Sequence, residues 1–537
     1  SQLPHRATMQ RANAILATLG VIGLLTPGLA AQESNWDHWG IEFANSGATE
    51  AQEPFMRGVT ALHLHMFEDA EAHFQQAQRV DPDFTMAYWG EAMAHNQPIW
   101  RIQHRDQAHA ILERLGSTPA DRAARASTTR EKDYLATLEI LYGMGDKRAR
   151  DVAYEQAMRQ LSERYPDDTE ALAFWTLSRV VLFPRTRVGM QQRMKTAALA
   201  QEILKRNPHH PGGARYLIQA TDDPIHADLG LIAAEMLVDA QPQSSTARHL
   251  PGHVFIQLGR WAEAAKQHMT AFDASMQWTD AHGYTLEQLN DHNYVHLLNY
   301  GQYCYLQLGQ LEKARDIIDL TRRDYRRSDR SPTIGSALAI TSARYLIETA
   351  QWEMTAELAA SANRDKFGDH PGLQLALGLG AGWTGQRELA RASLAWLARF
   401  DTTRGAIMRH QVAALIRRAE GDVEGAVQLL ANAVDIEDET IAFTHLGVDA
   451  HLMKPSHELY GEVLLSEKRP SEALEMFEAA LIRYPGRTAS LLGAARSSAA
   501  VGNRGLAQRY YSAVQENFVN ADPKHPIVQE LVSFLSN

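Results

Sequence analysis

Two histidine pairs with a spacing of four residues suggest a metal site in the middle of the chain. His249 and His253 flank the string Leu-Pro-Gly, and His292 and His296 lie in DHNYVHLLNYGQ. Residues four apart share one face of a helix, so both imidazoles of the second pair can reach one ion. Because proline suits the first turn of a helix, we expect His253 on a helix and His249 in the loop before it. These four histidines are our candidate metal ligands.

Nearby aspartates could complete this site. Asp222, Asp223 and Asp291 offer carboxylate oxygens, and imidazole with carboxylate suits a single divalent ion of zinc, iron or copper with an open coordination position. We therefore take Asp222 and Asp223 as candidate catalytic residues. The spacing is not H-E-x-x-H, so the glutamate of the common zinc proteases is absent. The alternative is that the histidines pack between helices and hydrogen-bond to backbone carbonyls.

A second candidate metal group lies nearer the N-terminus. We expect His63 near the end of the first helix of its repeat and His95 just after a helix of the next repeat. The two could then meet on the concave face together with Glu91, and the nearby Met66 would suit copper. The alternative is that these side chains only pack in the core.

Four further residues are candidates for ligand binding. Trp89 and Trp100 lie in or beside segments that interrupt the repeats, where they could line a pocket for an apolar or cationic ligand. Arg215, next to Tyr216, could hold a carboxylate through two parallel hydrogen bonds. The alternatives are that the aromatic rings belong to the core and that Arg215 pairs with the aspartates that follow it.

A helical repeat must position these residues. In segment 52–85, small and aromatic residues recur every three to four positions and a proline follows the last turn, which is typical of a helix pair. The clearest second copy is 454–487, and a third follows directly. The shift from Ala473 to Ala507 is 34 residues, the period of the tetratricopeptide (TPR) repeat. Degenerate copies centre on Ala264, Ala314, Ala390 and Ala426.

The predicted fold is therefore all-α, an α-solenoid of TPR-like helix–turn–helix repeats. Helix pairs of this kind stack because none can bury its apolar face alone. Irregular insertions at 96–130, 207–252 and 276–294 break the period, and we expect them to close over the concave face. We divide the chain into an N-terminal solenoid with the histidine-rich centre, 31–330, and a C-terminal TPR solenoid, 331–537.

Three strings resemble a group of large bacterial secreted TPR proteins that are rich in histidine: FMRGVTALHLHMFEDAEAHFQQAQRVDPDFTMAYWGEAMAHNQPIW, HHPGGARYLIQATDDPIHADLGLIAAEMLVDAQP and HLPGHVFIQLGRWAEAA. The resemblance covers most of the chain after residue 30, and it implies the fold and no particular reaction. Of the group's motifs, H-P-G is kept at 210–212 and H-x-P-x-H-x-F at 249–255. The H-Y-x-I-H motif is changed, because Arg215 and Gln219 replace its two histidines. That departure implies that no metal site uses these two positions and that a different ligand is bound there.

The composition excludes several classes of function. Among 537 residues, 45% are hydrophobic and 22% charged, which is typical of globular proteins. The formal net charge is -11, so we expect no nucleic-acid partner, which would need a basic stripe. The single cysteine, Cys304, excludes metal sites with several thiolates, so any metal must bind to the 23 histidines or to carboxylates.

The first 30 residues are predicted to be a secretory signal peptide. Arg6 and Arg11 precede an apolar run at 12–25, and Gly28-Leu29-Ala30 supplies the small residues of a cleavage site. Met9 is a possible translation start, and a short membrane anchor is the alternative. We expect an exported protein, periplasmic or extracellular, with no stable membrane span after cleavage.

Two functions fit these observations. The first is an exported TPR solenoid that binds a peptide, protein or small-molecule ligand on its concave face. The second is a metal-dependent enzyme, a hydrolase or oxidoreductase, with a divalent ion in the central His/Asp site.

Overall fold

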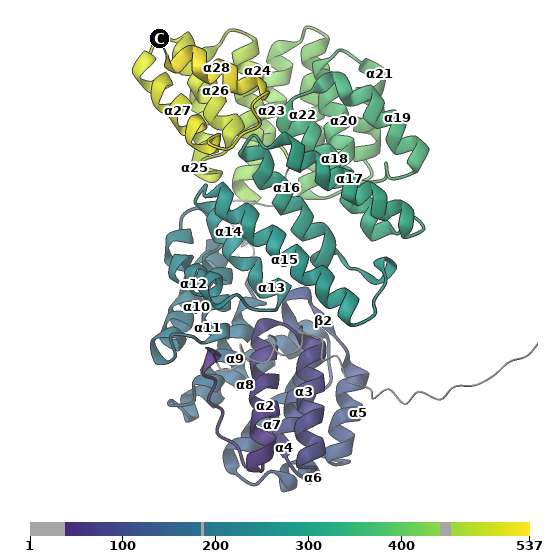
Figure 1. Ribbon diagram of the computed structural model, residues 1–537, viewed down its shortest axis with the longest axis vertical. Coiled ribbons are helices and arrows are strands. Elements are labelled where there is room, and N and C mark those ends of the chain that lie inside the picture. Colours follow the sequence, from purple (N-terminus) through teal and green to yellow (C-terminus); the bar gives the residue numbers. More distant parts are fainter. Residues whose placement is uncertain (1–37, 184–186, 441–452, 537) are drawn as a thin grey trace, which may run out of the picture.

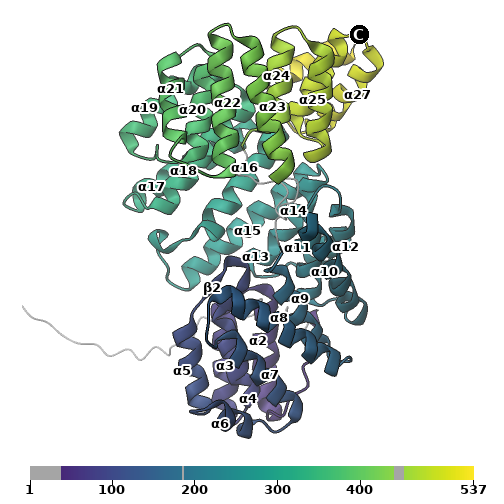
Figure 2. The ribbon, with the colours of Figure 1, turned by 180° about the vertical axis from the view of Figure 1, so that it is seen from behind.

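The computed structural model describes residues 38–183, 187–440 and 453–536. Within these ranges the protein is a stack of paired helices with one short β-ribbon, which confirms the predicted all-α solenoid. Figures 1 and 2 show the pairs following one another in chain order, from the N-terminal repeats at one end to the C-terminal repeats at the other. The predicted signal peptide, residues 1–30, lies outside the described residues.

The first half of the stack ends with the long helix α15. Its elements are η2 (Thr49–Ala51), α2 (Gln52–Leu64), α3 (Phe67–Val80), α4 (Thr85–Ala94), β1 (Asn96–Gln97), η3 (Pro98–Trp100), β2 (Ile102–Gln103), α5 (Arg105–Leu115), α6 (Pro119–Arg125), α7 (Thr129–Leu141), α8 (Lys147–Arg164), α9 (Thr169–Val180), α10 (Arg187–Arg206), α11 (Pro211–Thr221), α12 (Ala227–Ala240), α13 (Ser245–Arg248), α14 (Leu250–Gln257) and α15 (Trp261–Ala281). Strands β1 and β2 are antiparallel, with Asn96 opposite Gln103.

The second half begins with a short 3-10 turn, η4, and a π-helical turn, η5, that leads into α16. Its elements are η4 (Leu286–Gln288), η5 (Asp291–His296), α16 (Leu297–Gln307), α17 (Leu311–Arg327), α18 (Pro332–Thr349), η6 (Trp352–Met354), α19 (Thr355–Asp365), α20 (Pro371–Trp383), α21 (Arg387–Leu397), α22 (Thr403–Ala419), α23 (Val423–Thr440), α24 (Ser456–Ser466), α25 (Pro470–Arg483), α26 (Thr488–Ala500), α27 (Arg504–Asn517) and α28 (Pro526–Leu535). The domain boundary expected at residue 330 falls between α17 and α18, and these two helices pack against each other. The boundary stays a prediction.

The repeat period has a direct packing cause in the first helices. The ring of Phe74 on α3 fits between Gly58 on α2 and Gly90 on α4. A Cβ atom at Gly58 would lie 2.8 Å from this ring, and one at Gly90 would lie 2.2 Å from it. Only glycine therefore lets the three helices come this close.

The C-terminal repeats use the same contact. Phe477 on α25 fits between Gly461 on α24 and Gly493 on α26, with the same spacing of sixteen residues on each side. Ala473 and Ala507, which define the period of 34, are both fully buried. The sequence repeat and the packing repeat are therefore the same feature.

The C-terminal repeats fold back onto the middle of the chain. The indole nitrogen of Trp261 donates a hydrogen bond to the carbonyl of Gly486 (2.9 Å), and the hydroxyl of Thr488 donates one to the carbonyl of Gln307 (2.6 Å). Figures 1 and 2 show α25 beside α14 and α16 in both views. The segment between α25 and α26 thus contacts the start of α15 and the end of α16.

Two of the predicted insertions face each other. Segment 96–130 folds into the β-ribbon with α5 and α6, and segment 276–294 forms the end of α15 and the turns η4 and η5. The two segments meet at Trp100 and His292, whose ring centroids are 5.1 Å apart. Segment 207–252 instead forms helices α11 to α13. None of the helices in the described part of the chain has both the length and the hydropathy needed to span a bilayer.

Candidate metal centre

Three of the four predicted central histidines converge on one point. His249 caps α14, His253 lies on that helix and His296 ends the π-helical turn. One nitrogen from each ring lies within 4.8 Å of the others, and the Nε2 atoms of His253 and His296 are 3.3 Å apart. Two metal–nitrogen bonds of about 2.05 Å at a tetrahedral angle place their nitrogens about 3.3 Å apart. The spacing of His253 and His296 therefore fits a shared ion, and the ring of His249 lies next to both.

The remaining ring nitrogens are held by acceptors. The Nδ1 atom of His253 donates to Asp222 Oδ2 at 3.0 Å, and the other oxygen of Asp222 accepts from Gln257 at 2.9 Å. The Nδ1 atom of His249 donates to the carbonyl of Ser245 at 3.1 Å. Because these oxygens are hydrogen-bond acceptors, Nδ1 is the donor in both rings, and the Nε2 atom of His253 is turned towards that of His296.

His292 lies beside this group and outside it. Its ring centroid is 5.1 Å from that of His249 and 5.2 Å from that of His296. These centroid distances match those within the group, so the difference lies in the ring nitrogens: only those of His249, His253 and His296 lie within 4.8 Å of one another. The expected helix at this point starts as a π-helical turn, a rare form that is concentrated at functional sites.

Sequence reasoning missed two residues of the centre. His268 on α15 is fully buried and neither of its ring nitrogens has a hydrogen-bond partner in the described structure. Its ring stacks on Tyr300, with centroids 5.0 Å apart. Both residues lie inside ordinary repeat helices, so no local pattern marks them.

Burial sets the charge state of the centre. Burial holds the pKa of His249 well below its usual value. The nearby imidazoles lower this pKa further, and among them His296 has the largest effect. Burial by itself would raise the pKa of Asp222, but the charge of His253 and hydrogen bonds from His253 and Gln257 outweigh this effect and lower it. A neutral imidazole beside an ionised carboxylate is the state that binds a metal ion.

The two candidate catalytic aspartates have different places. Asp222 is the hydrogen-bond partner of His253, so it orients a candidate ligand. Asp223 contacts Arg193 at 2.9 Å and His226 at 2.9 Å, and it accepts from the backbone of Ile225. The carboxylate of Asp223 thus takes part in a buried ion pair and in the turn before α12, and its catalytic role stays a prediction.

The N-terminal histidine belongs to another group. His63 Nε2 lies 2.8 Å from Glu170 Oε2, and His210 Nε2 lies 3.0 Å from Glu170 Oε1. The hydroxyl of Tyr216 lies 2.7 Å from His63 Nδ1, and His210 Nδ1 accepts from the backbone of Gly213. These side chains are fully buried, and each of these imidazole nitrogens has a partner. The group is a closed hydrogen-bond network.

Glu170 was missed because it lies 107 residues from His63 in the sequence. Burial raises its pKa, but the charges of His210 and His63 and their hydrogen bonds outweigh this effect and bring the pKa to about 2.

The expected meeting of His63 with His95 is wrong. The ring of His95 lies 5.9 Å from that of His104, and its Nε2 lies 3.8 Å from Glu71. Glu91 instead binds Arg114. His63 and His95 are on different helices whose side chains enter different parts of the core.

A large cavity lies next to the central histidines, between the two facing insertions. Its volume is about 700 Å³, and residues lining it include His65, Trp100, Thr246, Trp278 and His292. The ring of Trp100 contacts both His65, at 5.7 Å, and His292, at 5.1 Å. The predicted place of Trp100 in a pocket is thus confirmed.

The other predicted ligand-binding aromatics are buried. Trp89 is fully buried among Phe43, Tyr134 and Phe174, with ring centroids 5.1 to 5.6 Å away. Tyr216 is equally buried and contacts His63. Both are core residues, so the structure corrects their assignment to a pocket.

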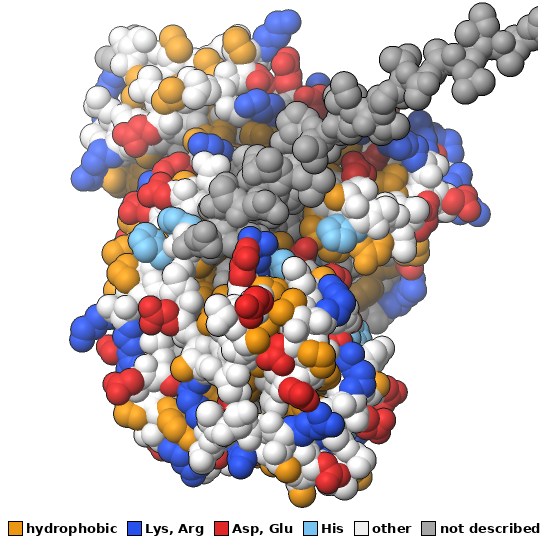
Figure 3. Space-filling model, turned by 60° about the horizontal axis from the view of Figure 1, so that its bottom comes forward, with side chains coloured by type: hydrophobic (Ala, Val, Ile, Leu, Met, Phe, Trp, Pro, Cys, Tyr) orange, Lys and Arg blue, Asp and Glu red, His pale blue; other side chains and the backbone are white. Residues whose placement is uncertain are grey.

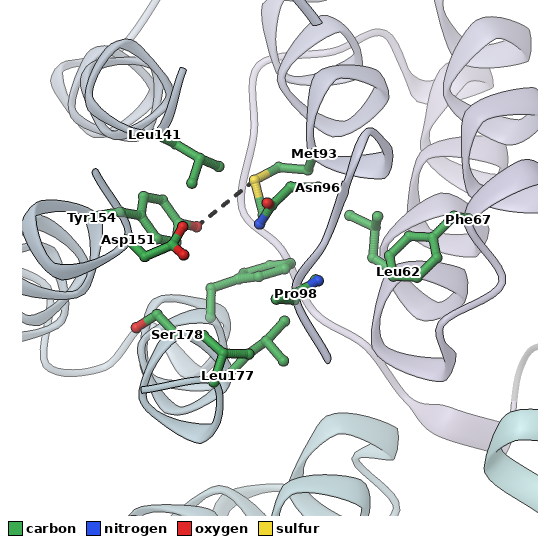
Figure 4. A pocket seen from close by; sticks show the side chains of 12 residues that line it. Leu62, Phe67, Met93, Asn96, Pro98, Leu141, Asp151, Tyr154, Leu177 and Ser178 are labelled. Atoms are coloured by element: carbon green, nitrogen blue, oxygen red, sulfur yellow. Dashed lines mark hydrogen bonds between the residues drawn. The ribbon is translucent and has the colours of Figure 1, made fainter. Parts of the chain in front are cut away.

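A smaller pocket in the N-terminal core has no comparable chemistry. Figure 4 shows it enclosed mainly by apolar side chains, with Tyr154 contacting the sulfur of Met93. Its volume of about 20 Å³ leaves room for roughly one water molecule. A ligand site in the described structure is therefore better sought at the larger cavity.

The charge distribution agrees with a mixed surface. Figure 3 shows basic and acidic side chains interspersed over the N-terminal face, with no basic stripe among the described residues on that face.

No protein-family model matches the chain, and no curated protein matches it in sequence. Several solved structures have a similar arrangement of helices. The human IFIT1 dimer with m7Gppp-AAAA is 11% identical, with a TM-score of 0.37 over 82% of this chain and 90% of that one. The TPR domain of P58(IPK) is 13% identical, with a TM-score of 0.20 over 91% of this chain and 97% of that one. The APC/C hetero-tetramer Cut9–Hcn1 is 11% identical, with a TM-score of 0.32 over 90% and 96%. The likeness is loose, so the repeat fold rests on the helix pairs of this chain.

Proposed function

We propose that this protein is a metal-dependent enzyme built on a TPR-like solenoid. A single divalent ion of zinc, iron or copper would bind to His249, His253 and His296. The observation that carries the proposal is the fixed orientation of two of these rings, whose Nδ1 protons point to Asp222 and to the carbonyl of Ser245. Imidazoles that bind metals are commonly held in this way.

A centre of this kind supplies acid–base chemistry to a ligand in the adjacent cavity. Three protein ligands leave a coordination position for water or substrate, and a bound divalent ion lowers the pKa of that water or polarises a carbonyl. His292 lines the cavity and contacts His249 and His296, so it connects the two spaces. A substrate that enters the cavity can therefore approach the centre.

The cavity also supports a second candidate, a solenoid that binds a ligand without chemistry. Its volume of about 700 Å³ is in the range of small-molecule sites, and its aromatic walls suit an apolar ligand. TPR solenoids commonly bind peptides or proteins. The ligand of such a binding protein could therefore also be a peptide or a protein. We also propose that the protein is exported, because the sequence of residues 1–30 has the pattern of a signal peptide.

Metal analysis of protein purified without a histidine tag separates these candidates. We expect one ion per chain in the wild type, and none in the double variant His253→Ala/His296→Ala with an unchanged circular dichroism spectrum. The exposed pair His209 and His282 provides the matched control, and its double alanine variant should keep the ion. Wild-type protein that neither holds nor takes up zinc, iron or copper would support the binding protein instead.

A further inference from the structure

Arg215 on α11 is a buried cation without a carboxylate partner in the described structure. Only 2% of its surface is exposed. One terminal nitrogen donates to Thr246 Oγ1 at 3.3 Å, and its Nε has no hydrogen-bond partner. By contrast, Arg193, Arg344 and Arg487 are as deeply buried and each contacts an aspartate or glutamate. An unpaired buried charge is strongly unfavourable, so the fold by itself gives no reason to keep this arginine.

The aspartates that follow Arg215 in the sequence do not neutralise it. Asp222 accepts from His253 and Gln257, and Asp223 is bound by Arg193. The internal ion pair that the sequence left open is therefore absent, and Arg215 is free to bind a ligand.

His65 is a second unsatisfied group at the same place. It is 4% exposed, and neither ring nitrogen has a hydrogen-bond partner in the described chain. Its backbone adopts the left-handed conformation, with φ of 58°, at the end of α2. Burial, and after it the charge of Arg215, holds the pKa of His65 well below its usual value. The backbone conformation serves to end α2, whereas the two unpartnered ring nitrogens are polar groups that a ligand could satisfy.

His65 belongs to the wall of the large cavity, and Arg215 lies behind that wall. Thr246, the hydrogen-bond partner of Arg215, lines the cavity as well. The carboxylates of Glu68, Asp69 and Asp291 belong to the same lining, and so does the ring of Trp278. One cation opposed by these carboxylates favours a singly charged anion over a phosphate dianion. The aromatic walls favour an apolar body on that anion.

We propose that Arg215 binds the carboxylate of a small aromatic or apolar carboxylic acid in this cavity. The guanidinium would pair with the carboxylate oxygens, and His65 would add a hydrogen bond from a ring nitrogen. The assignment deepens the proposed function, because it names the substrate class of the metal centre and rests on that function for the chemistry. Binding of the carboxylate itself does not require the metal.

Isothermal titration calorimetry with 3-phenylpropanoate and its neutral amide, 3-phenylpropanamide, tests the assignment. We expect the acid to bind wild-type protein at least roughly tenfold more tightly than the amide, which is the range for a charge-assisted pair in a buried site. Arg215→Gln should remove this preference, and Arg215→Lys should keep part of it. Equal binding of acid and amide, or no binding of either up to millimolar concentrations, would overturn the proposal.

Two further measurements, phosphate competition and a metal-site variant, keep the test decisive. The acid–amide comparison uses the wild type, so it stands even where Arg215→Gln does not fold. Inorganic phosphate should compete less well than the acid, and the reverse order would overturn the assignment to a carboxylate. The variant His253→Ala/His296→Ala should retain the preference for the acid. A protein that binds the acid but no metal would therefore refute the proposed enzyme and leave the carboxylate site intact.

Discussion

In the N-terminal histidine group, Glu170 holds His63 and His210 at once, and the outer nitrogens of both rings are bonded to Tyr216 and Gly213. In the central group, oxygen acceptors hold the Nδ1 atoms of His249 and His253, and the Nε2 atom of His253 lies 3.3 Å from that of His296. Both groups have the compactness of a metal site. A metal in the first group would replace the hydrogen bonds of both imidazoles to Glu170, whereas a metal in the second would replace only the contact between two imidazoles.

The comparison shows that proximity is a weak criterion for a metal centre. The better criterion is where the second nitrogen of each imidazole points, because metal-binding histidines donate one N–H to an oxygen and keep the other nitrogen free. By that criterion the N-terminal group stabilises the fold and the central group is arranged for function. Four predictions can break or sharpen this contrast.

The largest effect is expected at Glu170. Replacing it by glutamine removes the buried charge that holds two imidazoles, and we expect a loss of about 3–5 kcal/mol in the free energy of unfolding, measured with urea. Metal content should not change. Glu163→Gln, which alters an exposed carboxylate, should cost less than about 0.5 kcal/mol. If Glu170→Gln instead releases a metal ion from a stable protein, the two groups have been assigned the wrong way round.

Acid should destabilise the N-terminal group. The pKa of Glu170 is lowered from 4.5 to about 2, so its contribution is fully present above pH 4.5 and is lost as the pH falls towards 2. The shift corresponds to roughly 3 kcal/mol. Unfolding measured over this range should therefore be more acid-sensitive in the wild type than in Glu170→Gln. Parallel pH profiles for the two proteins would contradict the network.

Neighbouring aspartates should have separate effects. Asp222→Asn weakens the acceptor that orients His253, and we expect metal affinity to fall by about 10–100-fold in a competition assay with a chelator. Asp223→Asn is the matched control: it should lower stability through Arg193 and leave metal affinity unchanged. Equal effects of the two variants on metal affinity would show that Asp222 has no special part in the centre.

The smallest effect is expected at His292. Because its ring lies outside the three-nitrogen group, His292→Ala should keep one ion per chain and change its affinity by less than about tenfold. His249→Ala, by contrast, should lose the ion under the same conditions. A complete loss in His292→Ala would restore the four-histidine site that the sequence predicts.

Much of the fold could be predicted because its contacts are local. Phe74 touches glycines sixteen residues away on each side, so the packing rule is written into a short period. His253 and His296 could be selected for the same reason, since each lies in a short string with a helical spacing. Trp100 could be placed beside a pocket because it interrupts the repeat.

The partners of these residues could not be predicted. His253 contacts Asp222, which is 31 residues away in the sequence, and His296, which is 43 residues away. His63 contacts Glu170, which is 107 residues away. Such pairs depend on how far the solenoid turns between repeats, which no local pattern encodes. Arg215 illustrates the point, because its sequence neighbours are acidic and yet bind other groups.

The amino-acid sequence alone determined that the chain is a helical repeat and that imidazoles are concentrated in its centre, because helix pairing acts between residues close in the chain. Only the tertiary structure decided which imidazoles share a point, which are hydrogen-bonded away, and which buried arginine lacks a counter-charge. Those properties depend on distances between stacked repeats, where a few ångströms separate a metal ligand from a core residue.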